Sequence, residues 1–168
     1  MRIALTPIAL LIAAYSFAQP FERVEVVKVD STRSAADLYR TAERWFVDTF
    51  KDAQEVIQLR DTVTHTIVGK GSMYSSAHCF GTYAVEVETR DGRYRVRVYD
   101  AAAMGYPFGH IADSTYERMK IEGVPGLGKK TYASVLDTQR ACYRHFEEHM
   151  AAIPPSLKAA MVKPKDDW

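Results

Sequence analysis

Apolar and polar positions alternate most clearly between residues 83 and 99, in the stretch YAVEVETRDGRYRVRVY. Such alternation is typical of half-buried strands, and Asp91-Gly92 in its middle marks a tight turn. Asp-Gly favours a two-residue type I′ turn, in which both central residues need a positive φ. We therefore predict a hairpin in which Arg90 faces Arg93 and each earlier residue faces its counterpart in order.

This register separates the hairpin into an apolar face and a charged face. It pairs Glu88 with Arg95 and Glu86 with Arg97, and such opposite-charge cross-strand pairs contribute about 0.2–1 kcal/mol each. Only the arginines beside the turn, at positions 90 and 93, have no acid directly opposite. If the hairpin binds a ligand by charge, the tip is therefore the first place to expect it.

Two longer segments carry apolar residues at helical spacing. The first spans residues 34–51 and begins at Ser34, whose hydroxyl can cap the helix, with Asp37 in the positive first turn. The second runs to Ile153 and is predicted to end at Pro154-Pro155, because proline lacks the amide hydrogen that a helix needs. The apolar stripes are Leu38, Ala42, Trp45, Phe46 and Phe50 in the first, and Tyr132, Val135, Leu136, Cys142, Tyr143, Phe146, Met150 and Ile153 in the second.

Further strands are predicted over residues 24–29, around Ile57 and Leu59, and over 67–74. The element order is then β-α-β-β-β-β-α. This order predicts an α+β two-layer sandwich, with a five-stranded antiparallel sheet and two helices on one face. The domain is expected to cover residues 19–153, followed by a C-terminal tail over 154–168.

The two cysteines, Cys79 and Cys142, are predicted to face the same interior. Cys79 shares the parity of Val85 and Val87, and Cys142 lies in the apolar stripe of the second helix. Both a disulfide and a pair of buried thiols satisfy this arrangement, so both alternatives stay open.

The N-terminus has the three parts of a secretory signal peptide. Arg2 is followed by an apolar run from Ile3 to Ala14 and by the small residues of Ser16-Phe17-Ala18. We predict cleavage after Ala18 and a periplasmic or secreted protein; a buried N-terminal helix or strand is the alternative. No second long apolar segment follows, so no membrane span is expected.

The charge balance weighs against nucleic acid as a partner. The formal net charge is +1, and loss of Arg2 with the signal peptide leaves equal numbers of basic and acidic residues. A protein that binds polyanions by charge ordinarily carries a basic excess. The length fits one domain with a substantial core.

Several stretches resemble a known family. They are SAADLYRTAERWFVDTFKDAQEVIQLRD, TIVGKGS and YAVEVETRDGRYRVRVYD, within residues 24–100. Together they are similar to an exported bacterial domain of unknown function with a TBP-like fold, common in Bacteroidetes. The resemblance implies a fold and no activity, since no catalytic residues are established for that family. DNA binding is not implied by the fold alone.

Two motifs suggest chemistry but lack the required context. His145-Phe146-Glu147-Glu148-His149 matches the H-x-x-E-H pattern, in which His145 and His149 would hold zinc and Glu148 would act as base. A catalytic zinc needs a third protein ligand, and only the acids near the C-terminus follow. The stretch GVPGLGKK at 123–130 has Lys130 where a P-loop requires Ser or Thr.

The sequence therefore predicts a non-enzymatic, exported binding module with no cofactor. Its partner would be an unknown protein or envelope ligand, and a small metal-dependent hydrolase using His145, Glu148 and His149 is the alternative. A merely solvated sheet face competes with the binding surface. No role is assigned to residues 101–130. The candidate binding residues are Lys70, Tyr74, Arg90, Arg93, Arg95, Arg97 and Tyr99, with Glu86 and Glu88 between them.

Overall fold

The computed structural model describes residues 21–50, 52–76, 79–103, 106–107 and 129–162. The predicted signal peptide, residues 108–128 and residues 163–168 lie outside this description. The same holds for all but the last two residues of GVPGLGKK.

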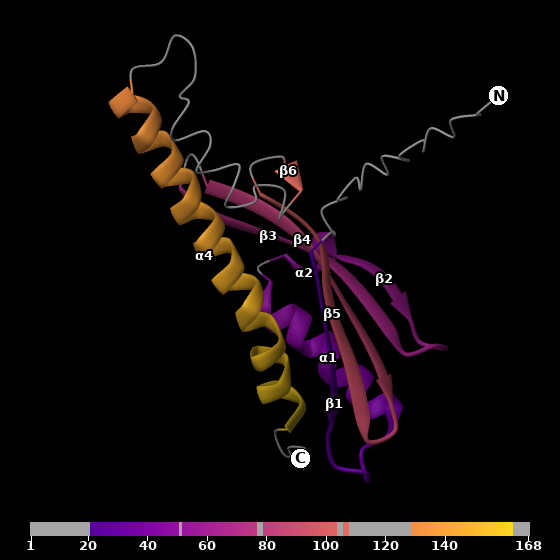
Figure 1. The fold of residues 1–168 in the computed structure, drawn as a ribbon. Helices are drawn as coiled ribbons and strands as arrows, with labels where there is room; N and C mark the ends of the chain where they lie inside the picture. Colours follow the sequence, from indigo (N-terminus) through magenta and orange to yellow (C-terminus); the bar gives the residue numbers. More distant parts are fainter. Residues whose placement is uncertain (1–20, 51, 77–78, 104–105, 108–128, 163–168) are drawn as a thin grey trace, which may run out of the picture.

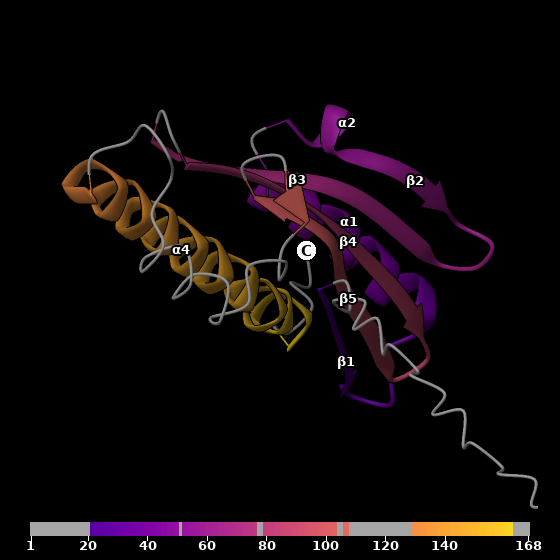
Figure 2. The same cartoon turned by 45° about the horizontal axis from the view of Figure 1, so that its top comes forward.

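The sheet is antiparallel throughout, in the order β1-β5-β4-β3-β2. The short strand β6 adds to β5 beyond this path. Figure 2 shows β1 and β2 at opposite ends of the sheet. The strands are β1 (Glu22–Lys28), β2 (Ile57–Asp61), β3 (Thr66–Ser76), β4 (Cys79–Arg90), β5 (Arg93–Ala103) and β6 (Tyr106–Pro107).

The helices are α1 (Ala35–Thr49), α2 (Ala53–Val56) and α4 (Lys129–Val162). The two long helices pack on one face of the sheet (Figure 1). Phe46 of α1 lies over Gly69 of β3, and Phe146 of α4 lies over Gly81 of β4, where an added Cβ would come within 2.6 Å of the ring in each case. The absent side chains therefore let both rings approach the strands. The predicted α+β sandwich is confirmed.

Helix α1 begins where the sequence predicts. The Ser34 hydroxyl accepts a hydrogen bond from the backbone N–H of Asp37 at 3.2 Å, which satisfies one of the donors left free at a helix start. The apolar stripe is buried against the sheet, with Leu38 and Phe46 fully inaccessible. Burial of this stripe, more than helix propensity, stabilises the helix.

The predicted end of the last helix is wrong. Helix α4 continues to Val162 with Pro154 and Pro155 inside it. Beyond the prolines, Leu157 and Met161 are fully buried in the core. Trp45 of α1 also donates a hydrogen bond to the Ser156 hydroxyl at 3.0 Å. These tertiary contacts offset the hydrogen bonds that the prolines cannot make.

The hairpin register is confirmed, but the turn type is wrong. Glu86 pairs with Arg97 and Arg90 with Arg93, as the alternation predicts. A type I′ turn needs positive φ at both central residues. Here Gly92 has φ +68°, whereas Asp91 is not in the left-handed region.

The loop between β1 and α1 explains this turn. The N–H of Gly92 donates to the carbonyl of Arg33, and its own carbonyl accepts from the N–H of Val29, both at 2.9 Å. The Asp91 carboxylate accepts from the backbone N–H of Ala35 at 2.7 Å. The turn is therefore shaped by partners distant in sequence as well as by its own two residues.

Candidate functional site

The candidate surface is the sheet face opposite the helices. Along β5, Tyr94, Val96 and Val98 are buried beneath the helix layer, so the alternate side chains project to the other face. Residues that pair across strands lie on the same face, so the pairing also shows which side chains of β4 and β3 lie opposite the helices. The structure therefore places every candidate residue of the sequence analysis on this one face, called the open face below. They are Lys70, Tyr74, Glu86, Glu88, Arg90, Arg93, Arg95, Arg97 and Tyr99.

Five charged side chains of the open face, from Glu86, Glu88, Arg90, Arg95 and Arg97, form one connected ladder of ion pairs. Glu88 pairs with Arg90 at 2.8 Å and with Arg95 at 2.6 Å. Arg95 reaches Glu86 at 3.3 Å, and Glu86 lies 3.8 Å from Arg97. Both predicted cross-strand pairs are therefore present, with diagonal links that the register alone did not indicate.

The ladder continues onto β1, which the sequence analysis missed. Glu22 accepts a hydrogen bond from the Nε of Arg97 at 2.5 Å, and this bond holds the pKa of the guanidinium above its ordinary value. The guanidinium also lies 4.2 Å from the ring centroid of Tyr99, within range of a cation–π contact. No local signal places β1 beside β5, so Glu22 was not identifiable from alternation.

The hairpin tip is more basic than the rest of the face. Lys28 of β1 lies opposite Arg93 in the register, and Arg93 forms no ion pair with any residue in the described ranges. Arg90 pairs with Glu88, two residues earlier on the same strand. The tip remains the predicted place for binding by charge, now with Lys28 added.

Apolar and aromatic side chains flank the ladder on both sides, and of these the sequence analysis selected Tyr74 alone. Val24 and Val26 of β1 are 49% and 64% exposed, and Leu59 of β2 is 48% exposed. At the far end, Tyr74 faces Phe80 across β3 and β4, with exposed fractions of 74% and 47%. The open face thus combines a balanced charged centre with exposed apolar margins.

The sheet bends near Tyr99. The pairing of β4 with β5 shifts register between Thr82 and Ala84, and Asp100 on β5 has φ +52°. A shift of this kind is a β-bulge, which puts two residues opposite one and increases the local twist. Tyr99 therefore stands at the boundary between two differently oriented parts of the face.

The H-x-x-E-H segment does not assemble a metal centre in the described part of the chain. His149 Nε2 lies 2.9 Å from the Tyr83 hydroxyl, and His145 and Glu148 are exposed on α4. Across the described ranges, no group of three His, Cys, Asp or Glu side chains could hold a metal. Asp166 and Asp167, the acids that follow the motif, lie outside those ranges.

The Tyr83–His149 contact is a neutral hydrogen bond. Burial raises the pKa of Tyr83 to about 12, so its hydroxyl stays protonated near neutral pH. Partial burial, with a smaller contribution from His145, lowers the pKa of His149, although part of the imidazole remains exposed. A neutral His149 can therefore accept a hydrogen bond from the Tyr83 hydroxyl at Nε2.

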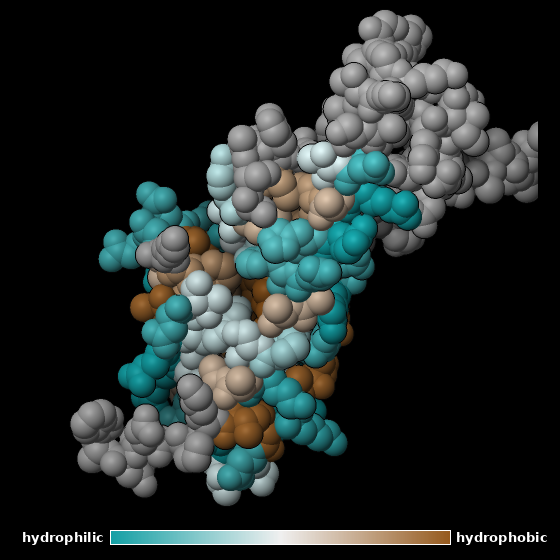
Figure 3. Space-filling view, turned by 90° about the vertical axis from the view of Figure 1, so that its left-hand side faces the viewer, coloured by the Kyte–Doolittle hydropathy of each residue, from teal (hydrophilic) through white to brown (hydrophobic). Residues whose placement is uncertain are grey.

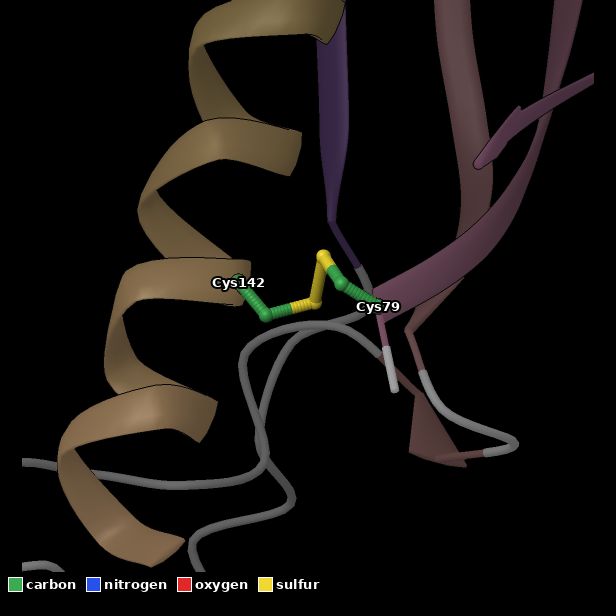
Figure 4. Close-up of a disulfide and its surroundings, with 2 residues drawn as sticks. All are labelled: Cys79 and Cys142. Atoms are coloured by element: carbon green, nitrogen blue, oxygen red, sulfur yellow. A yellow bond between two sulfur atoms is a disulfide. The ribbon is translucent and has the colours of Figure 1, made fainter. Parts of the chain in front are cut away.

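A disulfide joins Cys79, the first residue of β4, to Cys142 of α4 (Figure 4). Both side chains are buried. Of the two alternatives left by the sequence, the structure has the disulfide. It attaches α4 to the sheet near Tyr83 and Phe146.

Figure 3 looks onto the α4 side of the molecule, where hydrophilic and hydrophobic residues are interspersed. Among the described helices, none has the length and apolar character of a membrane span.

Comparison with known proteins agrees with the fold. Residues 24–102 match the family model DUF4468, described as a domain of unknown function with TBP-like fold. Over this segment the chain is similar to the DUF4468 family. The matched residues contain α1, α2 and the strands β2, β3 and β4, with most of β1 and nearly all of β5, whereas α4 lies beyond them.

Solved structures resemble the chain over more of its length. A DUF4468 family protein from Bacteroides ovatus is 18% identical, with a TM-score of 0.55, over 89% of this chain and 90% of its own. A TBP-like protein from Parabacteroides distasonis is 11% identical, with a TM-score of 0.48, over 82% of this chain and 92% of its own. No curated protein matches significantly. The likeness to the Bacteroides ovatus protein supports the fold and carries no activity with it.

Proposed function

We propose that this protein is an exported, non-enzymatic binding module that holds a partner protein on its open face. The observation that carries the proposal is the one-sided arrangement of the sheet. In the described ranges both long helices pack on the same face, and the other presents a charge ladder between exposed apolar residues. Protein interfaces combine apolar contact area with polar groups that set orientation in this way.

The balanced charge of the ladder favours a protein over a polyanion as the partner. Each ladder arginine already meets a carboxylate, and the Glu86 and Glu88 side chains are only 17% and 20% exposed. A polyanion would have to displace these carboxylates, whereas a protein can add complementary charges at the margins.

Export rests on the N-terminal pattern, and the disulfide supports it. Disulfides persist mainly in oxidising compartments such as the periplasm and the extracellular space. Mass spectrometry of the protein recovered from its producing cells tests export directly. A mature chain starting at Gln19 is expected, and an intact Met1 would contradict the proposal.

Site-specific cross-linking tests the binding surface. A photoreactive phenylalanine analogue at Tyr74 probes the open face, and the same analogue at Lys158, exposed on α4, is the matched control. Irradiation of intact producing cells is expected to give a discrete adduct from position 74 and none from position 158.

A second variant separates specific from incidental contact. Arg95→Glu with Arg97→Glu reverses the ladder's charge at an exposed and a half-buried position outside the core, so the fold should persist, as checked by thermal unfolding. The adduct from position 74 is expected to disappear. An adduct that survives this reversal, or equal adducts from both probe positions, would exclude the open face as the binding surface.

A further inference from the structure

The outer edge of β1 is a candidate for pairing with a second strand. In the described part of the chain β1 pairs with β5 alone, so its other side is a row of peptide groups without a strand partner. Proteins ordinarily protect such edges with proline, bulges or charged side chains. The seven residues Glu22–Lys28 contain no proline, and their pairing with β5 has no register shift. Four of the seven are charged, two acidic (Glu22, Glu25) and two basic (Arg23, Lys28), so charge is the protection this edge has, and its two signs are balanced.

The hydrogen-bond phase shows which peptide groups point outward. The N–H of Val29 donates to the carbonyl of Gly92 on the β5 side. Peptide groups alternate in direction along a regular strand, so odd-numbered residues face β5 and even-numbered residues face outward. Val24 and Val26 therefore combine outward peptide groups with exposed β-branched side chains.

The charges of β1 are complementary to those of a second β1. Arg23 and Glu25 lie on the helix side of the strand and pair with each other at 2.8 Å. Consider an antiparallel pair of two β1 strands with Val24 opposite Val24 on a twofold axis. Arg23 of each copy then lies opposite Glu25 of the other, twice, with no like charges directly opposed.

The same register satisfies the backbone and the apolar residues. Val24 has outward peptide groups, so the two Val24 residues on the axis form a hydrogen-bonded pair, one of the two kinds of pair in an antiparallel ladder. Phe21 then lies opposite Val27, and both are partly buried against the core in each copy. Shifting the axis to residue 25 would instead place Glu25 against Glu25, which is destabilising.

We infer that β1 is a dimerisation strand, which pairs antiparallel with β1 of a second copy about Val24 to form a sheet continuous through two molecules. The contact is isologous, as in most homodimers. The interface is small, so association is expected to depend on concentration. The proposal uses the backbone edge of β1, whose Val24 and Val26 side chains also form one margin of the open face.

Sedimentation velocity of the wild-type protein over a wide concentration range is the first test. The expected result is a concentration-dependent doubling of mass. Val24→Pro should abolish it, because proline removes an outward N–H and leaves the odd-numbered bonds to β5 intact. A wild-type protein that stays monomeric throughout, or a proline variant that dimerises as wild type does, would overturn the proposal.

Charge exchange supplies a test that folding defects cannot imitate. Arg23→Glu and Glu25→Arg should each be monomeric alone, because each homodimer opposes like charges. Mixed together they should form a heterodimer, since both acids of the first variant's β1 then face the two arginines of the second variant's β1. The double variant in one chain should dimerise again. Failure of both the mixture and the double variant would exclude this register and the proposal with it.

Discussion

The Tyr83 hydroxyl lies 2.9 Å from Nε2 of His149, and this contact joins β4 to α4 about two helical turns beyond the disulfide at Cys142. It also engages one histidine of the H-x-x-E-H segment with a tyrosine. The segment therefore contributes to packing of α4 on the sheet, and its chemistry can be examined through stability.

His149 should give the protein a recognisable pH dependence. Its folded pKa is lowered below the ordinary value of 6.5, so the unfolded chain binds the proton first as pH falls. The free energy of unfolding should therefore decrease as pH drops through about 6.5 towards the lower folded pKa. His149→Gln should lose this component in urea unfolding at several pH values. His145→Gln should reduce this component only in part, because His145 makes the smaller contribution to the lowered pKa of His149. Equal pH slopes for wild type and His149→Gln would contradict the expectation.

Removing the disulfide should destabilise the protein strongly. The disulfide joins residues 63 positions apart in the sequence. For a loop of this length the chain-entropy relation gives a stabilisation of about 4 kcal/mol, and disulfides usually contribute about 2–4 kcal/mol. Cys79→Ala with Cys142→Ala should lower the free energy of unfolding accordingly, as measured with denaturant. Reductant should destabilise the wild type and leave the double variant unchanged; a reductant effect on the double variant would point to another cause.

Leu157 tests whether the part of α4 beyond its prolines contributes to the core. The side chain is fully buried, so Leu157→Ala should cost about 2–5 kcal/mol in the free energy of unfolding. Lys158→Ala, next to it and exposed, should change stability by about 0.5 kcal/mol or less. Equal small effects for both variants would mean that residues after Pro155 do not contribute to the core.

Gly81 tests the close approach of α4 to the sheet. An added Cβ would lie 2.6 Å from the Phe146 ring, so Gly81→Ala should cost about 1–3 kcal/mol through overpacking. Combining it with Phe146→Leu should cost less than the sum of the two changes, because the smaller side chain relieves the collision. Strict additivity in a double-mutant cycle would show that the two residues do not meet. Thr82→Ala, on the exposed neighbour, serves as control.

Local patterns predicted the individual elements well. The alternation around Asp91-Gly92 predicted each cross-strand pair from Arg90–Arg93 to Val85–Val98, because a two-residue turn and a side-chain period of two leave one register that buries the valines. The stripe beginning at Leu38 and the Ser34 cap predicted α1. The predicted fold class followed from element order, and the open-face residues followed from parity.

Contacts between distant segments decided the rest. Local rules predict that the helix ends at Pro154-Pro155. Helix α4 nevertheless continues beyond them, because Leu157 and Met161 are buried in the core. The turn at Asp91-Gly92 is shaped by Arg33 and Ala35 of the β1–α1 loop. The sequence did not decide whether the two cysteines form a disulfide. Two cysteines that face the same interior can be bonded or can remain thiols, and only their positions in the structure distinguish these states.

The placement of β1 shows most clearly which features follow from the sequence and which depend on the tertiary structure. Its sequence indicates a strand, because β-branched residues suit a pleated backbone. The local sequence does not indicate that β1 pairs with β5, because the packing of the whole sheet determines which strands become neighbours. The position of β1 beside β5 brings Glu22 to Arg97 and exposes Val24 and Val26 on a strand whose other edge has no strand partner among the described residues. The last link of the ladder and the proposed dimer strand therefore exist only in the tertiary structure.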